Sequence, residues 1–197
     1  MTLDFWFDFA STYSYLSAMR IEAAASARGV AVCWRPFLLG PIFAAQGWTT
    51  SPFNIYEAKG RYMWRDMERL AEEGGHALVR PEPFPQNSLK AARLAISADG
   101  ETWQPSLCRA IFLAEFGEGR DISDDGVLGE IVDDLGQDTG TWLARTQDQA
   151  VKDALRARTE AAMAAGIFGA PSFTVGTELF WGNDRLDQAI AWAAKDK

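Results

Sequence analysis

A strand-to-helix turn near the start of the chain holds the residues whose spacing most directly suggests chemistry. Ser11 and Ser14 stand in the spacing Ser-x-x-Ser, after an alternating run that ends at Phe9 and at the start of a helix-like run. A Cys-x-x-Cys pair at such a turn carries out thiol–disulfide exchange, which serine cannot do. A serine hydroxyl can still hydrogen-bond to the sulfur of a thiol brought from outside. The turn therefore favours binding of an external thiol.

Ser11 has a second interpretation, as the N-cap of the helix that follows. Serine is a favoured N-cap because its hydroxyl accepts a hydrogen bond from a free backbone N–H of the first turn. The turn alone does not exclude either role. A helix N-terminus also carries partial positive charge, so an anion beside Ser11 would be stabilised and the pKa of a bound thiol lowered.

Composition and charge exclude several classes of function. The chain has 197 residues, of which 48% are hydrophobic, and a net charge of −8. It has no basic stripe with interleaved aromatic residues, so we expect no nucleic acid partner. No apolar stretch approaches the ~20 residues that span a bilayer, so we expect no membrane partner. The first strand begins at once, without a signal segment, which predicts a cytoplasmic protein.

Few residues are available for metal or nucleotide chemistry. His76 is the only histidine and lies in a polar stretch, which argues against a His-rich metal site and favours a solvated loop histidine. Cys33 and Cys108 are far apart, and we expect free thiols packed as small hydrophobic side chains. The chain has neither a Gly-x-Gly-x-x-Gly motif nor a P-loop signature. We therefore expect no metal and no nucleotide.

The two ends of the chain predict one α/β lobe. The first end predicts a strand (residues 3–9), a helix (13–27) and a second strand (30–36). The second end predicts a hairpin of two strands (172–175 and 178–181), followed by a helix from residue 182 on. We expect Gly29 to end the first helix, and Asn183 or Asp184 to cap the last one.

The middle of the chain is almost entirely helical from Pro41 to about Ala165. Residues 40–55 are expected to be irregular because of their glycines and prolines, and Pro81, Pro83 and Pro85 indicate a stiff extended loop. We therefore divide the chain into an α/β lobe, residues 1–40 plus 166–197, and a helical insertion, residues 41–165, that covers the active site.

Four stretches together carry a resemblance to a known family. They are residues 8–16, residues 34–40 continuing into 59–63, residues 84–88, and residues 166–173 with 180–186. With them the chain resembles the DsbA-like thioredoxin superfamily, and within it the 2-hydroxychromene-2-carboxylate isomerases, relatives of kappa-class glutathione transferases. This resemblance implies a thioredoxin-like β-α-β/β-β-α lobe split by a large helical insertion. It also implies glutathione as the external thiol.

The resemblance implies a set of glutathione-binding residues. Ser11 would be the catalytic residue, as a donor that orients the glutathione sulfur, and a cis Ala170–Pro171 bond would face it. Asp184 would bind the γ-glutamyl ammonium. The implied cofactor-binding set is Ser11, Ala170, Pro171, Trp181, Gly182, Asn183 and Asp184. Plain alternatives remain open, since Pro171 also suits the start of a strand and Asn183 or Asp184 a helix cap.

The second substrate has its own implied residues, which are Phe43, Trp48, Tyr62 and Asn87. Asn87 can equally cap the helix that begins near Ser88. The cations Lys59, Arg61 and Arg65 can attract an anion, or can pair with acidic neighbours along a solvated helix face. The chain departs from the family pattern at Thr12, where proline is frequent, and at Trp48, where asparagine is frequent. A basic residue frequent shortly before that position is absent after Phe43.

The function that these residues favour is glutathione-dependent cis-trans isomerisation of an aromatic enone carboxylate of the 2-hydroxychromene-2-carboxylate type. A kappa-type glutathione transferase that conjugates an electrophile is the nearest alternative. A non-catalytic glutathione-binding module is another. We expect a small aromatic carboxylate as substrate, and a homodimer is left open.

Overall fold

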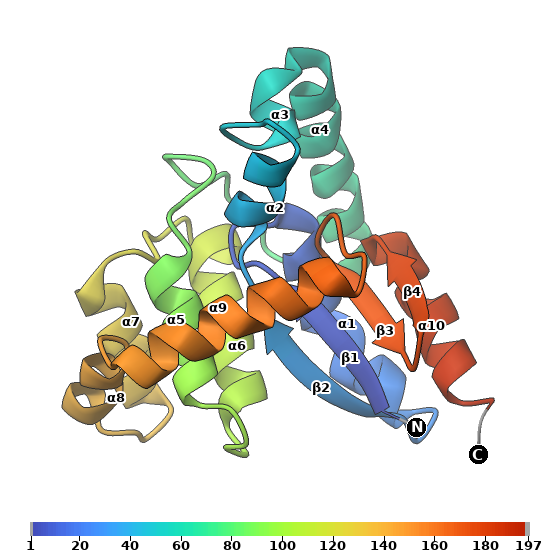
Figure 1. Ribbon diagram of the computed structural model, residues 1–197. Helices are drawn as coiled ribbons and strands as arrows, with labels where there is room; N and C mark the ends of the chain where they lie inside the picture. Colours follow the sequence, from blue (N-terminus) through green and yellow to red (C-terminus); the bar gives the residue numbers. More distant parts are fainter. Residues whose placement is uncertain (1, 196–197) are drawn as a thin grey trace.

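The computed structural model describes residues 2–195 and contains one mixed four-stranded sheet, in the order β2-β1-β3-β4 (Figure 1). β1 (Thr2–Phe7) is parallel to β2 (Ala31–Pro36), and α1 (Thr12–Ser26) connects the two. β3 (Ser172–Val175) is antiparallel to both β1 and β4 (Glu178–Trp181). The fold class predicted from the sequence is confirmed. The strand bounds differ by at most two residues, whereas the last helix begins at Leu186, four residues later than expected.

The chain between β2 and β3 is helical. It forms α2 (Leu39–Ala45), α3 (Pro52–Ile55), α4 (Glu57–Gly74), α5 (Leu89–Ser97), α6 (Gln104–Phe112), the π-helix η1 (Leu113–Gly117), α7 (Asp125–Asp134), α8 (Thr139–Arg145) and α9 (Gln149–Ala164). After β4 follow a short 3₁₀ turn, η2 (Asn183–Arg185), and α10 (Leu186–Ala193). In Figure 1, α3 and α4 project beyond one end of the sheet, whereas α7 and α8 lie to one side of it.

The expectation that residues 40–55 are irregular was wrong, because α2 and α3 form there. Pro52 stands in the first turn of α3, where its missing N–H has no helical partner to lose. Ser51 caps this helix, with its hydroxyl oxygen 3.3 Å from the backbone nitrogen of Phe53. The proline that seemed to break a helix therefore begins one.

The sheet buries apolar side chains on both faces. Alternation along β1 directs Leu3, Phe5 and Phe7 into the main core, against α1 and α10, while Trp6 faces the other side. Trp6 packs there in a smaller cluster with residues of α2, of α9 and of the segments that follow β2 and α9, namely Phe37, Ile42, Ala162 and Ile167. Figure 1 shows α9 crossing in front of the strands and α1 behind them. The sheet is therefore covered on both faces and holds the first turn of α1 rigidly.

The main core continues from the sheet into the helical insertion without a break. Phe7 contacts Phe112 of α6 at a ring-centroid distance of 5.6 Å, and Met63 of α4 and Leu128 of α7 belong to the same cluster. The division into residues 1–40 plus 166–197 and residues 41–165 stays a prediction.

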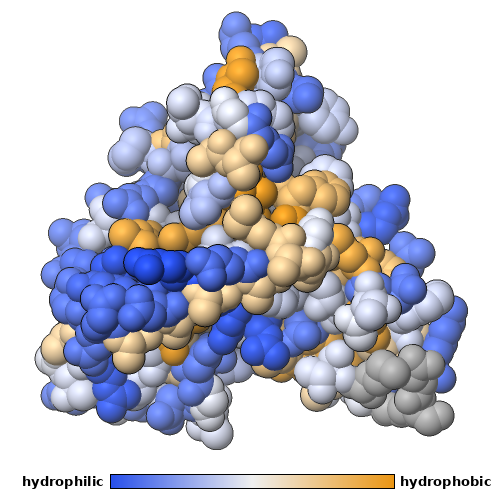
Figure 2. Space-filling view, viewed as in Figure 1, coloured by the Kyte–Doolittle hydropathy of each residue, from blue (hydrophilic) through white to orange (hydrophobic). Residues whose placement is uncertain are grey.

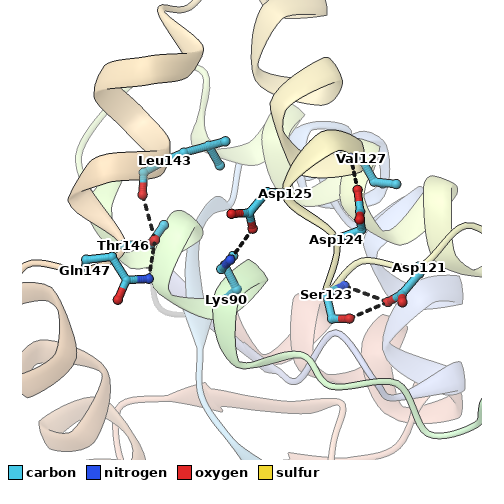
Figure 3. A network of polar contacts seen from close by, with 9 residues as sticks. All are labelled: Lys90, Asp121, Ser123, Asp124, Asp125, Val127, Leu143, Thr146 and Gln147. Carbon is cyan, nitrogen blue, oxygen red and sulfur yellow. Dashed lines mark hydrogen bonds and ion pairs between the residues drawn. The ribbon is translucent and has the colours of Figure 1, made fainter.

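Polar contacts fix the outer helices of the insertion (Figure 3). Asp124 caps α7 by accepting a hydrogen bond from the backbone of Val127 at 3.1 Å. Lys90 of α5 pairs with Asp125 of α7, and the hydroxyl of Thr146 donates to the carbonyl of Leu143 at 2.7 Å. These contacts join α5 to α7 and stabilise the start of α7 and the end of α8.

The outer surface is hydrophilic along α9, whereas apolar side chains gather at the centre of the same face, near α2 and the segment that leads into β3 (Figure 2). Within residues 2–195, no helix combines the length and the apolarity that crossing a membrane requires.

Candidate functional site

A cleft of about 1440 Å³ opens at the N-terminal end of α1. Its walls are the first turn of α1, the α2–α3 segment, residues 84–88, and residues 168–171 with 181–185. All seven predicted glutathione-binding residues line it, and so do Phe43, Trp48 and Asn87. Residues from both ends of the chain and from the insertion are thus brought to one cavity.

Ser11 makes two hydrogen bonds at the base of this cleft. Its hydroxyl oxygen accepts from the backbone N–H of Ser14, with an oxygen–nitrogen distance of 3.3 Å, so the N-cap interpretation is confirmed. The same hydroxyl donates to the carbonyl oxygen of Ala170 at 3.0 Å. The cap therefore does not use the hydroxyl proton, which lies between α1 and the segment before β3.

Ser14, at the second position of the Ser-x-x-Ser spacing, has a different environment. Its side chain is fully buried, and its hydroxyl oxygen has no hydrogen-bond partner among the described residues. The backbone N–H groups of Thr12 and Tyr13 also lack partners in the part of the chain that the structure describes, as is usual in a first helical turn. Of the two serines in the Ser-x-x-Ser spacing, only Ser11 thus offers its hydroxyl to the cleft, together with the partial positive charge of α1.

The segment before β3 presents backbone groups to the cleft. The Ala170–Pro171 peptide bond is cis, as predicted. The carbonyl of Ala170 accepts from Ser11, whereas its N–H has no partner within residues 2–195. The indole of Trp181 packs over Gly169, where a Cβ would lie 2.5 Å from the indole nitrogen. Glycine is therefore required at 169 for Trp181 to reach this edge of the cleft.

The turn from Gly182 to Arg185 forms the far wall. Gly182 has a φ of 106°, and a Cβ there would lie 2.6 Å from a carboxylate oxygen of Asp184. The carboxylate of Asp184 is 72% exposed and lies 3.5 Å from the guanidinium of Arg185. Glycine at 182 thus allows the Asp184 carboxylate to fold back toward the cleft.

The expectation that Asn183 or Asp184 caps the last helix was wrong. Among the described residues neither side chain makes a capping bond to η2 or α10. The side-chain oxygen of Asn183 instead accepts from the hydroxyl of Ser17, at 2.9 Å, on α1. The side-chain oxygen that could have capped the helix is therefore bonded to Ser17 instead.

These polar groups fit a peptide thiol with a charged amino-acid end. The unpaired N–H and the carbonyl of Ala170 form a donor and an acceptor that an extended peptide could pair with, as an added strand does. The Asp184 carboxylate suits an ammonium group. Ser11 and the first turn of α1 suit a thiolate.

The part of the cleft that holds Phe43 and Trp48 is aromatic. The rings of Phe43 and Trp48 lie 5.8 Å apart between centroids, at an angle of 51°. Lys59 also lines the cleft, with its ammonium 4.6 Å from the ring centre of Tyr56. Arg61 and Arg65, by contrast, pair with Glu57 and Glu68 along the solvated face of α4, as the plainer interpretation predicted.

Tyr62 lies outside the residues that line this cleft. Its side chain is 64% exposed on α4, next to Met63, which is fully buried. Consecutive helical residues point about 100° apart, so burial of Met63 turns Tyr62 to solvent. Asn87 does line the cleft, and its side-chain oxygen accepts from the backbone of Leu89 at 3.1 Å, at the start of α5.

Asp8 is a residue of the site that sequence reasoning missed. It is almost fully buried in the cleft wall, where its carboxylate accepts hydrogen bonds from Ala10 N–H (3.0 Å), Ser88 Oγ (2.6 Å) and Leu39 N–H (2.8 Å). Burial raises the pKa of Asp8, and the three hydrogen bonds partly oppose this. One carboxylate thus joins three walls of the cleft. The sequence signal that could have identified Asp8 is its place between Phe7 and Phe9, where an acidic side chain in an apolar run must find hydrogen-bond donors.

His76 also lies at the cleft, which contradicts the prediction of a solvated histidine. It follows α4, as expected for a loop, but the ring is half-buried at 6.3 Å from the ring of Tyr15. Cys33 and Cys108 are free thiols, as predicted, and neither lines the cleft. Burial raises the pKa of both thiols, so the thiol form is favoured.

Comparison with known proteins places this architecture in a family. The model of the DsbA-like thioredoxin domain matches residues 2–190, and the chain belongs to that family. Within it, the chain is 30% identical to the 2-hydroxychromene-2-carboxylate isomerase of Sphingobium xenophagum, over 94% of both chains. It is 26% identical to the isomerase of the same name from Pseudomonas putida, over 94% of this chain and 91% of that one. The resemblance drawn from the sequence is confirmed.

A solved structure extends this similarity to three dimensions. A 2-hydroxychromene-2-carboxylate isomerase superposes with a TM-score of 0.90 at 26% identity, covering 99% of this chain and 95% of the other. The fold, including the helical insertion, is therefore similar to that enzyme over nearly the whole chain.

Proposed function

We propose that this protein is a glutathione-dependent isomerase of aromatic enone carboxylates of the 2-hydroxychromene-2-carboxylate type. The observation that carries the proposal is the hydrogen bond from the Ser11 hydroxyl to the carbonyl of Ala170, next to cis Pro171, in a cleft whose other side is aromatic. The isomerases that resemble the chain over nearly its whole length support the same reaction.

The glutathione side of the cleft is built from Ser11, Ala170 and Asp184. When bound, glutathione would supply thiolate chemistry, in which reversible addition to a conjugated carbon allows a double bond to rotate. The first turn of α1 stabilises negative charge at the sulfur position, because its N–H groups and its dipole point there. Asp184 would hold the ammonium of the γ-glutamyl end and so would orient the tripeptide in the cleft.

The Ser11 hydroxyl must change its acceptor for this arrangement to work. Its proton now points at the carbonyl oxygen of Ala170. A peptide N–H that pairs with the same carbonyl would compete with the hydroxyl for it and favour rotation of the hydroxyl toward the sulfur. We therefore propose that peptide binding and stabilisation of the thiolate are coupled through one carbonyl oxygen.

The aromatic side of the cleft supports a planar acceptor. Phe43 and Trp48 offer apolar surface to a ring, and Asn87 and Lys59 can donate to a carboxylate or to an enolate oxygen. Positioned donors of this kind stabilise charge that develops on an oxygen during reaction.

The test is conversion of 2-hydroxychromene-2-carboxylate to its open-chain isomer, followed by ultraviolet absorbance. We expect turnover with glutathione and none with S-methylglutathione, which binds the same groups but has no free thiol. Turnover at equal rate in both would overturn the glutathione dependence. Accumulation of a stable thioether would indicate a transferase, and binding without turnover a binding module.

Binding to the α/β lobe is tested separately by calorimetric titration with glutathione. Asp184→Ala should weaken binding by roughly tenfold if the ammonium contact forms, which is ~1.4 kcal/mol. Unchanged affinity in a folded variant would exclude the γ-glutamyl contact.

A further inference from the structure

Arg20 on α1 directs its hydrogen bonds to the turn that forms the far wall of the cleft. One terminal nitrogen donates to the backbone carbonyl of Asn183 at 2.7 Å, and the guanidinium reaches the side-chain oxygen of Asn183 at 3.4 Å. The other terminal nitrogen donates to Asp187 at 3.0 Å. Arg20 therefore joins the start of η2 and the first turn of α10 to α1.

Ser17, one turn earlier on α1, adds to this attachment. Its side chain is fully buried, and its hydroxyl donates to the side-chain oxygen of Asn183 at 2.9 Å. Because Ser17 and Arg20 both donate to Asn183, the oxygen of that amide must face α1. Its NH₂ group, which has no partner among residues 2–195, is left as a donor at the cleft.

The guanidinium of Arg20 is engaged too fully to act as the main ligand of an anion. Each of its three nitrogens already donates, and Asp187 balances its charge. Arg20 itself lines the cleft, but its printed hydrogen bonds go to Asn183 and Asp187. It therefore acts on the far wall mainly by holding Asn183, the residue next to Asp184.

The same helix carries Ser11 at its start. Arg20 lies nine positions after Ser11, a rise of about 13 Å along an α-helix. We infer that Arg20, together with Ser17, is a positioning residue that fixes the distance from Ser11 to Asp184 and thereby selects thiols with a γ-glutamyl end. This inference rests on the proposed glutathione dependence.

The experiment measures dissociation constants by calorimetric titration of the full chain with glutathione and with cysteinylglycine, which lacks the γ-glutamyl group. Arg20→Met should raise the dissociation constant of glutathione by about tenfold, the usual effect of losing hydrogen bonds to a charged group. The dissociation constant of cysteinylglycine should hardly change. Arg20→Lys should recover part of the preference. Arg109→Met is the matched control, because Arg109 pairs with Glu22 on α1 away from the cleft and should leave both constants unchanged.

A double variant separates positioning from direct contact. If Arg20 acts through Asp184, Arg20→Met combined with Asp184→Asn should bind glutathione no more weakly than the worse single variant, whereas direct contact would make the losses add. Additive losses, or a glutathione preference unchanged in Arg20→Met, would overturn the inference. Should Arg20→Met not fold, Ser17→Ala and Arg20→Lys give the same comparison. If the unaltered chain binds no glutathione, the proposed function itself fails.

Discussion

The hydroxyl oxygen of Ser11 lies 3.0 Å from the carbonyl oxygen of Ala170 and donates a hydrogen bond to it, across 159 positions of sequence. This contact joins the N-cap of α1 to the backbone beside cis Pro171. It places the one cleft hydroxyl of the Ser-x-x-Ser spacing where the backbone of a peptide would also bind. The serine is thus a structural cap and a candidate sulfur donor at once.

Ser11→Ala removes both roles together. Loss of the cap and of the bond to Ala170 should cost about 1–2 kcal/mol of unfolding free energy. If Ser11 also orients the glutathione sulfur, the thiol pKa of bound glutathione should rise, and the rate at neutral pH should fall by roughly ten- to a thousandfold. The measurement is the ultraviolet thiolate absorbance of bound glutathione against pH.

Ser14→Ala is the matched control for this variant, because the Ser14 hydroxyl is buried without a partner. Removing an unpaired buried hydroxyl should leave the stability equal or slightly higher, and the thiolate titration should not move. Identical titration curves for Ser11→Ala and the unaltered protein would mean that Ser11 is a cap only.

Asp8→Asn should weaken the hydrogen bonds that join the walls of the cleft. Both carboxylate oxygens of Asp8 face donors, from Ala10, Ser88 and Leu39, so an amide NH₂ must oppose one of them. We expect a loss of about 2 kcal/mol of unfolding free energy and a lower kcat, measured by urea unfolding and by the isomerase assay. Ser88→Ala, which removes a single donor, should cost about half as much. A stability equal to that of the unaltered protein would exclude the role of Asp8 in joining the walls.

Burial of Glu115 should make the stability of the protein fall as the pH rises. Its side chain lies in the π-helix η1, is fully buried, and has no hydrogen-bond partner for either oxygen among the described residues. Burial first, and then the nearby Asp8 and Asp121, raise the pKa of Glu115 well above its ordinary value of 4.5. Above that ordinary value the unfolded chain releases a proton that the folded chain keeps, so stability falls as pH rises toward the folded-state pKa.

Glu115→Gln removes this titration while keeping the shape of the side chain. Relative to the variant, the unaltered protein should lose about 1.4 kcal/mol of unfolding free energy per pH unit, from the ordinary pKa up to the raised one. Urea unfolding of both proteins over a pH series measures the difference. A difference that is constant with pH would contradict a raised pKa at Glu115.

The cysteines should not take part in turnover. Cys33 on β2 and Cys108 inside α6 lie outside the cleft lining, and burial keeps both in the thiol form. Cys33→Ser combined with Cys108→Ala should retain the isomerase rate, measured with glutathione at saturation. A loss of more than about tenfold, or ~1.4 kcal/mol of barrier, at unchanged stability would show that a thiol of the chain is needed.

The sequence by itself determined the elements and their order. Alternation in residues 3–9, the hairpin at Gly176 and the apolar spacing of the helices are local patterns, and local backbone preference is enough to read them. The motif stretches also indicated Ser11, Pro171 and Asp184, and all three line the cleft. Short helices such as α3 were not predicted, because a proline can begin a helix or break it, depending on its position in the helix.

Only the tertiary structure decided which partner each polar group takes. Asn183 looked like a cap from its neighbours, but it bonds to Ser17 on another helix. Asp8 offered only the signal of an acid between two phenylalanines and Arg20 offered none, since the partners that define their roles lie far away in the chain. Tyr62 matched a motif yet faces solvent, because burial of Met63 sets the rotation of α4. Hydrogen-bond partners and helix rotation are fixed by packing between distant segments, and sequence spacing does not contain that information.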